Sequence, residues 1–254
     1  MGSPLILVSN DDGIHSAGLA ALATALDAVG EVVIVAPDRE QSACSHALTL
    51  HRPLRIDEVG PRRYSVDGTP TDCVNLAINA ILKERRPALL VSGINRGANL
   101  GDDVTYSGTV SAAMEGTLLG VPSIALSLIG RTTFDFTISS DFAARLAAWV
   151  LAHGLPADTL LNVNVPQEFE GTAPRAVALT RMGRRRYGDA IVEKLDPRGR
   201  KYYWIGGEEV PFVAEEGTDF HAVQHGRISV TPIHLDLTNY PTLEQLAPLR
   251  ATWP

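Results

Sequence analysis

Short apolar runs rich in β-branched residues alternate with segments of helix length, and this pattern most constrains the fold. The first three runs are Leu5–Ser9, Val32–Ala36 and Ala88–Ser92. Strands of a parallel sheet have this character, because helices cover both faces of the sheet. Runs of the same kind at 122–127 and 160–165 extend the pattern. We therefore predict an α/β fold, a Rossmann-like mostly parallel sheet flanked by helices.

The segments between these runs carry helix signals. Apolar residues recur at helical spacing over 19–26, and Gly30 follows as a stop. Thr69, Pro70 and Asp72 fit a capping residue, a first-turn proline and an acidic residue three positions after the cap. A further helix is predicted over 139–153. Strands and helices therefore alternate, as they do in βαβ units.

Small oxygen-bearing residues follow the first three strands. Asp11 and Asp12 come after the first, Ser42 lies in the segment after the second, and Asn95 follows the third. Ligands of parallel sheets bind outside the carboxyl ends of the strands, so we expect these side chains to gather on one rim. Carboxylate, hydroxyl and amide oxygens suit Mg²⁺, Mn²⁺ or Ca²⁺. The pattern predicts a metal site there.

Each of these residues also has a simpler interpretation. An aspartate can cap the following helix, a loop serine is often solvated, and asparagine is common in turns. The shared position after successive strands is what favours a common site. In addition, the adjacent carboxylates of Asp11 and Asp12 repel each other, and a bound cation would remove that cost.

A possible phosphate site follows the third strand. Residues 94–106 form a long loop rich in Gly, Asn and Asp by prediction, and long loops are often functional. Ser107, Gly108 and Thr109 then begin a helix of small residues. Unpaired N–H groups at a helix start attract phosphate, although Ser107 could instead serve only as a cap. Two amides complete the possible pocket: Asn10 and Asn99.

Charge and cysteine content limit the partners and the location. The net charge of −7, from 22 basic and 29 acidic residues, argues against nucleic acid or an anionic membrane as the main partner. We see no signal peptide and no apolar run of the roughly 18 residues that span a membrane. The two cysteines lack metal spacing, with Cys73 predicted in the core and Cys44 in an accessible loop. A reducing compartment, the cytoplasm, is expected.

Several common enzyme signatures are missing. The chain has no Gly-x-x-x-x-Gly-Lys-Ser/Thr, no Gly-x-Gly-x-x-Gly after the first strand, no Gly-x-Ser-x-Gly elbow and no helical His-x-x-x-His pair. Walker-type NTPases, dinucleotide enzymes, α/β-hydrolases and zinc proteases are therefore disfavoured. His15 and His46 lie near the rim, where solvated roles are expected. The Arg181–Arg186 run suits a solvated hairpin or an oligomer contact better than a nucleic-acid patch.

After the apolar run at 160–165, the chain becomes richer in Pro, Gly and charged residues. We assign residues 1–165 to a catalytic α/β core and 166–254 to a β-rich extension within one integrated domain. The extension carries Tyr202–Trp204 and regains strand character over Arg227–Ile233. We expect it to contribute to the rim of the site and to oligomer contacts.

Seven segments, in order over nearly the whole chain, closely resemble the SurE (survival protein E) nucleotidase family. They are Ser9–Ile14, Val35–Ser42, Gly68–Val74, Ser92–Asn95, Ser107–Val110, Gly217–Phe220 and Ser229–Pro232. Cys44 departs from the pattern, since many relatives have a small residue such as Gly there.

The resemblance implies a metal-dependent phosphatase of nucleoside 5′- and 3′-monophosphates, with short polyphosphate as a further substrate. It implies one Mg²⁺ or Mn²⁺ per subunit, with Ca²⁺ as a substitute in crystals, and a homodimer or homotetramer. The metal ligands of the family fall on Asp11, Asp12, Ser42 and Asn95. Its phosphate-contacting segment falls on Ser107, Gly108 and Thr109.

The residues leave the mechanism open. Asp11 or Asp12 could be the general base or the nucleophile, and attack by a metal-activated water is the version we favour. A non-catalytic nucleotide-binding regulator is the alternative function, and it would bind nucleotide without releasing phosphate. A serine hydrolase using a rim serine is a third hypothesis, and it would work in EDTA.

Overall fold

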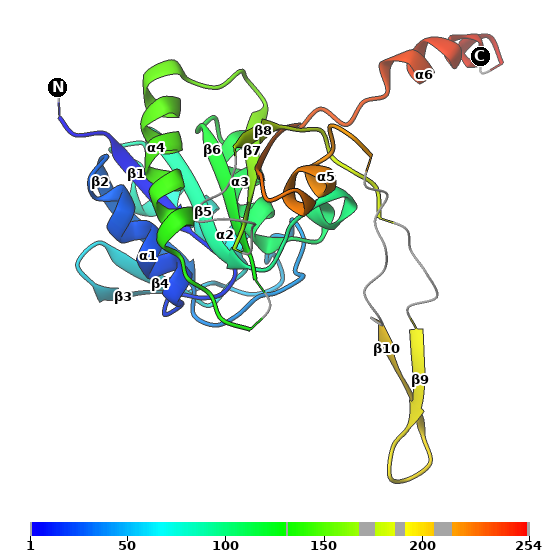
Figure 1. Cartoon of the computed structure of the whole chain (residues 1–254), viewed down its shortest axis with the longest axis horizontal. Coiled ribbons are helices and arrows are strands. Elements are labelled where there is room, and N and C mark those ends of the chain that lie inside the picture. The colour runs from blue at the N-terminus through cyan, green and yellow to red at the C-terminus, as the bar shows by residue number, and fades with distance from the viewer. Residues whose placement is uncertain (1, 131, 168–175, 186–190, 206–214, 253–254) are drawn as a thin grey trace.

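A nine-stranded sheet forms the centre of the molecule (Figure 1). The computed structural model describes residues 2–130, 132–167, 176–185, 191–205 and 215–252. The strands are β1 (Leu5–Ser9), β2 (Glu31–Pro37), β3 (Ile56–Gly60), β4 (Arg63–Val66), β5 (Leu89–Arg96), β6 (Ser123–Ile129), β7 (Thr159–Pro166), β8 (Val177–Leu179), β9 (Ile191–Leu195), β10 (Lys201–Ile205) and β11 (Ile228–His234). The helices are α1 (Ala17–Leu26), α2 (Pro70–Leu76), α3 (Gly108–Leu118), α4 (Thr137–His153), α5 (Asp219–Gln224) and α6 (Tyr240–Gln245). Three short helical turns join them: η1 (Ala77–Ile81), η2 (Gly101–Thr105) and η3 (Ala247–Ala251).

The strand order is β3-β4-β2-β1-β5-β6-β7-β11-β8. β1 pairs in parallel with both β2 and β5. Within the described part of this nine-stranded sheet, the antiparallel pairs are β3 with β4 and β11 with β7. The chain moves outward from β1 to β2 and β4, then returns to β5 on the other side of β1. The crevice at the carboxyl ends of β1 and β5 is therefore the topological switch point, where ligands of open α/β sheets bind.

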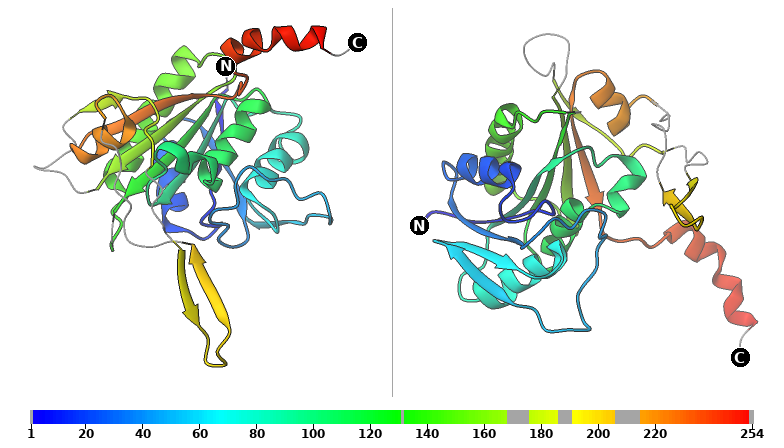
Figure 2. Two further views of the ribbon diagram at one scale, coloured as in Figure 1. Left: turned by 90° about the vertical axis from the view of Figure 1, so that its right-hand side faces the viewer. Right: turned by 90° about the horizontal axis from the view of Figure 1, so that it is seen from below.

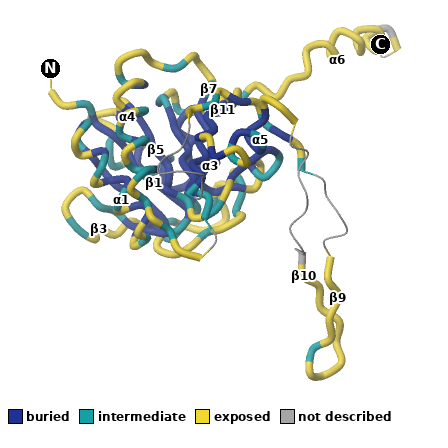
Figure 3. The backbone as a smooth tube through the Cα atoms, viewed as in Figure 1, coloured by how far each residue is buried: buried dark blue, intermediate teal, exposed yellow. Residues whose placement is uncertain are grey.

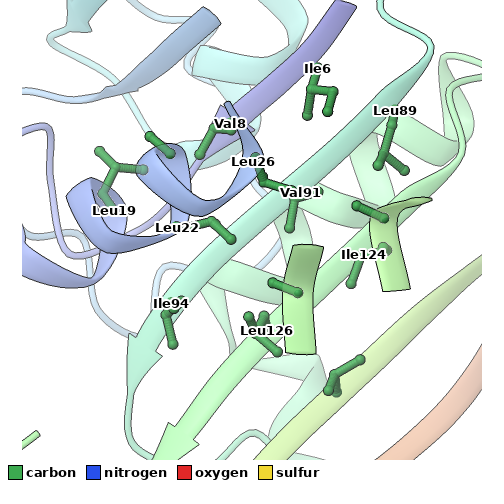
Figure 4. Close-up of a cluster of buried hydrophobic side chains, with 14 of the residues drawn as sticks. Ile6, Val8, Leu19, Leu22, Leu26, Leu89, Val91, Ile94, Ile124 and Leu126 are labelled. Atoms are coloured by element: carbon green, nitrogen blue, oxygen red, sulfur yellow. The ribbon is translucent and has the colours of Figure 1, made fainter. Parts of the chain in front are cut away.

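Helices cover both faces of the sheet, and the strands supply alternate residues to each face. Ile6 and Val8 of β1 pack with α1 and α4, as the close-up in Figure 4 shows for Leu19 and Leu22. Leu5 and Leu7 pack instead with α2 and α3. This two-residue alternation explains why the runs are continuously apolar, and it confirms the predicted α/β fold class.

The C-terminal segment adds to the same sheet. β8 and β11 extend it beyond β7, and β9 and β10 form a separate two-stranded hairpin. Figure 2 shows the hairpin and α6 projecting from the body, and Figure 3 shows their exposure. The division into a core and an extension at residue 165 stays a prediction. Within the described residues, no helix is both long enough and apolar enough to cross a membrane.

One local prediction, the loop after the third strand, was wrong. The predicted loop over 94–106 is instead the end of β5, through Arg96, followed by the 3-10 helix η2. The ladder with β6 shifts register after Ser92 and resumes at Asn95. Gly93 makes this possible, because its φ is +141° and a Cβ there would lie 2.4 Å from Leu126 O.

Other elements differ less from their predicted bounds. The helix predicted over 139–153 begins two residues earlier, since α4 spans Thr137–His153. The predicted helix from Pro70 begins with the expected Thr69 and Asp72 capping box, but it changes to a π-helical turn at Ala77. Cys73 is buried as predicted, whereas Cys44 is only partly accessible.

Candidate active site

Asp11 joins three segments at the switch point. Its side chain is 6% exposed, and Thr109 Oγ1, in the first turn of α3, donates a hydrogen bond to its Oδ1. Its backbone oxygen accepts from Gln41 N at 2.8 Å, in the loop after β2 that carries Ser42. The structure therefore brings the first strand, the second loop and the start of α3 together, and the common site of Asp11, Asp12, Ser42 and Asn95 stays a prediction.

The N-terminus of α3 lies directly against Asp11. A Cβ added to Gly108 would lie 2.7 Å from Asp11 Cβ and 3.0 Å from Cys44 Sγ, so only glycine fits. Ser107 caps the helix, since its Oγ accepts from Val110 N at 3.1 Å. The capping interpretation of Ser107 is thus realised, and the helix N-terminus with its positive dipole end faces a carboxylate. A cation beside the Asp11 carboxylate and a phosphoryl group at the helix N-terminus would fit this arrangement.

Asp12 faces the other side of the switch point. Arg96 Nη2, at the end of β5, lies 3.5 Å from its Oδ1. Its Oδ2 is buried and has no hydrogen-bond partner. Asp12 therefore has one oxygen left to accept a proton or to bind a cation.

Burial acts on both carboxyl groups. It raises the pKa of Asp11 to about 6, against the lowering effect of the Thr109 hydrogen bond, and the charge of Asp12 raises it further. Burial also raises the pKa of Asp12, while Arg96 lowers it and Glu40 raises it. Keeping these two buried carboxylates charged costs free energy in the folded protein. A bound divalent cation would offset that cost.

Ser42 and Asn95 supply the neutral oxygens of the predicted set. Ser42 is exposed, and its Oγ donates to Glu40 Oε1 at 2.6 Å. Asn95 donates through Nδ2 to Gly97 O at 3.0 Å, which uses the amide nitrogen rather than the oxygen that a metal would take. Ser42 follows Gln41, whose backbone N donates to Asp11 O. Asn95 precedes Arg96, which pairs with Asp12.

The donors fit a hard divalent cation. Within the described ranges, no three His, Cys, Asp or Glu side chains come together, so neutral oxygens would have to complete the coordination. Asp12 Oδ2 and Asn10 Oδ1 are buried acceptors without partners. Oxygen-only ligands suit Mg²⁺, Mn²⁺ and Ca²⁺ and not softer metals.

The two candidate pocket amides hold loops in place. Asn10 Nδ2 donates to Ser16 Oγ at 2.7 Å and so ties the loop after β1 to the start of α1. Asn99 is buried, and its Nδ2 donates to Ser127 Oγ at 2.8 Å. Its backbone N donates to Asn164 Oδ1 at 2.9 Å. Asn99 therefore anchors the segment that leads to Ser107.

Sequence reasoning missed two further anchors. The buried carboxylate of Glu115 on α3 pairs with His46 Nε2 at 2.8 Å and accepts from Asn75 Nδ2 at 2.7 Å. Asp219, fully buried, accepts from the backbone N of Gly101 at 2.7 Å and of Gly183 at 2.8 Å. No local signal could reveal these pairs, because their partners lie far apart in the chain.

The basic run pairs with the body of the protein. Arg185 donates from its backbone to Asp102 Oδ2 at 3.1 Å and from its side chain to Asp103 Oδ1 at 2.7 Å. Arg181 pairs with Glu215 at 2.9 Å. Among the described residues Arg181 and Arg185 lie outside the named strands, and the hairpin and oligomer-contact interpretations of the run stay predictions. Arg186 lies outside the described residues.

Fold and site together define an α/β protein with a pair of acidic residues and a helix N-terminus at its switch point. The profile of the family described as "Survival protein SurE" matches residues 6–189. The chain belongs to the SurE family.

Curated proteins and a solved structure are similar to this chain over almost their full length. A protein named "5'-nucleotidase SurE" from Syntrophotalea carbinolica is 59% identical over 245 residues, covering 96% of each chain. The protein of that name from Geobacter sulfurreducens is 59% identical over 243 residues, covering 95% of this chain and 92% of its own. The crystal structure of the Sure protein from Aquifex aeolicus superposes with a TM-score of 0.88 at 47% identity, covering 97% of this chain and 100% of that one.

Proposed function

We propose that this chain is a nucleotidase that hydrolyses nucleoside 5′-monophosphates to nucleoside and phosphate with a divalent cation. The observation that carries the proposal is the Asp11 carboxylate, buried against the first turn of α3 beside Asp12. Relatives that match over nearly their full length bear the name 5′-nucleotidase. Nucleoside 3′-monophosphates and short polyphosphate are further proposed substrates, on the strength of the family resemblance.

Asp11, Asp12, Ser42 and Asn95 are the proposed metal ligands. The cation, Mg²⁺ or Mn²⁺, would supply charge neutralisation and activation of a water molecule when bound. The backbone N–H groups of Gly108 and Thr109 are free of the helical ladder in the first turn of α3 and would hold phosphoryl oxygens. Asp12 Oδ2, buried without a partner, is the acceptor available for the proton of the attacking water.

Metal removal is the direct test of this proposal. Phosphate release from nucleoside 5′- and 3′-monophosphates should fall at least about 100-fold in EDTA and return when Mg²⁺ or Mn²⁺ is restored. Malachite-green detection across a panel of nucleotides and metals would measure it. Full activity in EDTA would favour a serine hydrolase instead. Nucleotide binding without phosphate release in any metal would favour the regulatory alternative.

We also propose that the chain forms a homodimer or homotetramer in the cytoplasm. The support is a set of large apolar side chains that remain at least half exposed on the projecting hairpin and near the C-terminus (Figure 3). They include Ile191, Tyr203, Trp204, Leu237, Leu243 and Leu249. Exposed apolar surface of this kind marks protein–protein contacts.

Substitution on α6 and η3 tests the assembly. The parent chain is expected to elute as a dimer or tetramer in size exclusion with light scattering. Replacing Leu243 and Leu249 with aspartate should shift it to a smaller species, because charges in an apolar contact are costly. Leu118→Asp, at an exposed leucine on the body, is the matched control. A monomeric parent would contradict the proposal.

A further inference from the structure

A pocket of about 420 Å³ adjoins Asp12 on the α1 side of the switch point. Its wall comes from the loop after β1, from Asp38 and Arg39 after β2, and from Arg96 at the end of β5. It therefore spans the carboxyl ends of three adjacent strands and shares Asp12 with the candidate active site.

The loops that form this pocket are fixed against each other. Ile14 N donates to Pro37 O at 2.8 Å, and Arg63 Nη2 donates to Ile14 O at 3.0 Å. Gly13 has a φ of +94°, and a Cβ there would lie 3.1 Å from the backbone carbon of Arg39. The pocket is thus a built feature, held by backbone contacts.

The adjacent aspartates divide the site into two halves. Asp11 contacts Thr109 on α3, whereas Asp12 contacts Arg96 and lines the pocket beside α1. A phosphate ester whose phosphoryl group lies at α3 would reach past Asp12 into this pocket with its other half. For a nucleotide, that other half is the nucleoside.

Asp38 has the position and the exposure to bind a sugar. Its side chain is 38% exposed, and its ion pair with the more exposed Arg39 spans 3.6 Å. An ionised carboxylate has two oxygens and only accepts, which suits two neighbouring hydroxyl donors. In dinucleotide-binding Rossmann folds, which carry a glycine-rich turn that this chain lacks, an acidic residue about 20 residues after that turn binds a ribose hydroxyl. Here Asp38 directly follows the second strand of the first βαβ unit.

The geometry points to Asp38 as the residue that recognises ribose, by accepting hydrogen bonds from the 2′- and 3′-hydroxyls of a nucleoside 5′-monophosphate in this pocket. The inference rests on the proposed nucleotidase function and adds a sugar specificity to it. Arg39, whose guanidinium lies 3.6 Å from the Asp38 carboxylate, then serves as the partner that holds this side chain in place.

Three phosphate esters separate this inference from the proposed function. They are a ribonucleoside 5′-monophosphate, its 2′,3′-dideoxy counterpart, and p-nitrophenyl phosphate, which has no sugar. The parent should favour the ribonucleotide over the dideoxynucleotide about tenfold in kcat/KM, the usual effect of hydrogen bonds to a charged group. Asp38→Ala should bring that ratio close to one, with the ribonucleotide losing about tenfold relative to p-nitrophenyl phosphate. Asp38→Asn, which keeps one acceptor oxygen, should give an intermediate ratio.

Asp57→Ala removes an aspartate from the exposed edge strand β3 and is the matched control, with all three rates unchanged. An Asp38→Ala variant that keeps the parent preference would overturn the inference. An equal loss on all three substrates would also overturn it, because that result indicates a general effect on the fold. If the parent hydrolyses none of the three with metal present, the proposed function fails, and the ribose assignment fails with it.

Discussion

Asp12→Asn is expected to lower kcat/KM for a nucleoside monophosphate roughly 10³-fold while the protein stays folded. The substitution keeps the shape of the side chain but removes its charge and replaces the buried, unpartnered Oδ2 acceptor. Phosphate release at saturating metal, with circular dichroism as the check on folding, measures the effect. Asp57→Asn, at an exposed aspartate on β3, is the control. Parent-like turnover by Asp12→Asn would remove Asp12 from the site.

The companion variant Asp11→Asn should change the free energy of unfolding in a direction that follows from the pKa of Asp11. Burial raises the pKa of Asp11 from 3.8 to about 6, so the folded state binds the proton more tightly than the unfolded state. The stability that this group contributes is fully present below pH 3.8 and is lost as the pH rises through about 6. In metal-free buffer at pH 7, Asp11→Asn should therefore be more stable than the parent, by up to about 3 kcal/mol.

A bound divalent metal should make the parent more stable than Asp11→Asn. A ligand that binds only the folded state stabilises it, so Mn²⁺ should raise the Tm of the parent but not that of Asp11→Asn. Thermal melts of both proteins, with EDTA and with Mn²⁺, give the comparison. An equal Mn²⁺ shift in both would place the ion elsewhere on the protein.

The strands and most helices could be predicted because their signals are local. Buried parallel strands must be apolar throughout, and the capping box at Thr69 and Asp72 is complete within four residues. The rim followed from topology, since the ends of neighbouring parallel strands meet. Gln41, bonded to Asp11, lies on the segment after β2 that the strand pattern places on the rim, and Thr109, also bonded to Asp11, lies at the helix start predicted as the phosphate site.

The remaining features depend on contacts that no local pattern encodes. The extension of β5 to Arg96 needs a register shift that Leu126 and Gly93 allow together. The pairs Glu115–His46 and Asp219–Gly101 join residues 69 and 118 positions apart. The sequence predicts Asp11 and Asp12 on one rim, but only the structure shows that Asp11 contacts α3 whereas Asp12 pairs with Arg96 and lines the pocket beside α1.

Gly108→Ala is expected to reduce activity at least about 100-fold. The added methyl group would lie 2.7 Å from Asp11 Cβ and 2.9 Å from Asp11 Oδ2, closer than real contacts allow. Asp11 or the first turn of α3 must then move, and the carboxylate, the Thr109 hydroxyl and the free amides no longer share one geometry. Steady-state kinetics across metal concentrations measure the loss, which should include a higher metal requirement.

Gly116→Ala, on the same helix, separates the site from the packing of α3. Its methyl group would lie 2.6 Å from Ser123 Oγ and 3.1 Å from Leu90 Cδ1, where α3 packs against β5 and β6 and away from Asp11. Overpacking there should cost about 1–3 kcal/mol of stability in urea denaturation. Turnover per folded molecule should stay at the parent value. If Gly108→Ala instead lost only stability, with parent turnover, then the close contact between Asp11 and α3 would not be what the reaction requires.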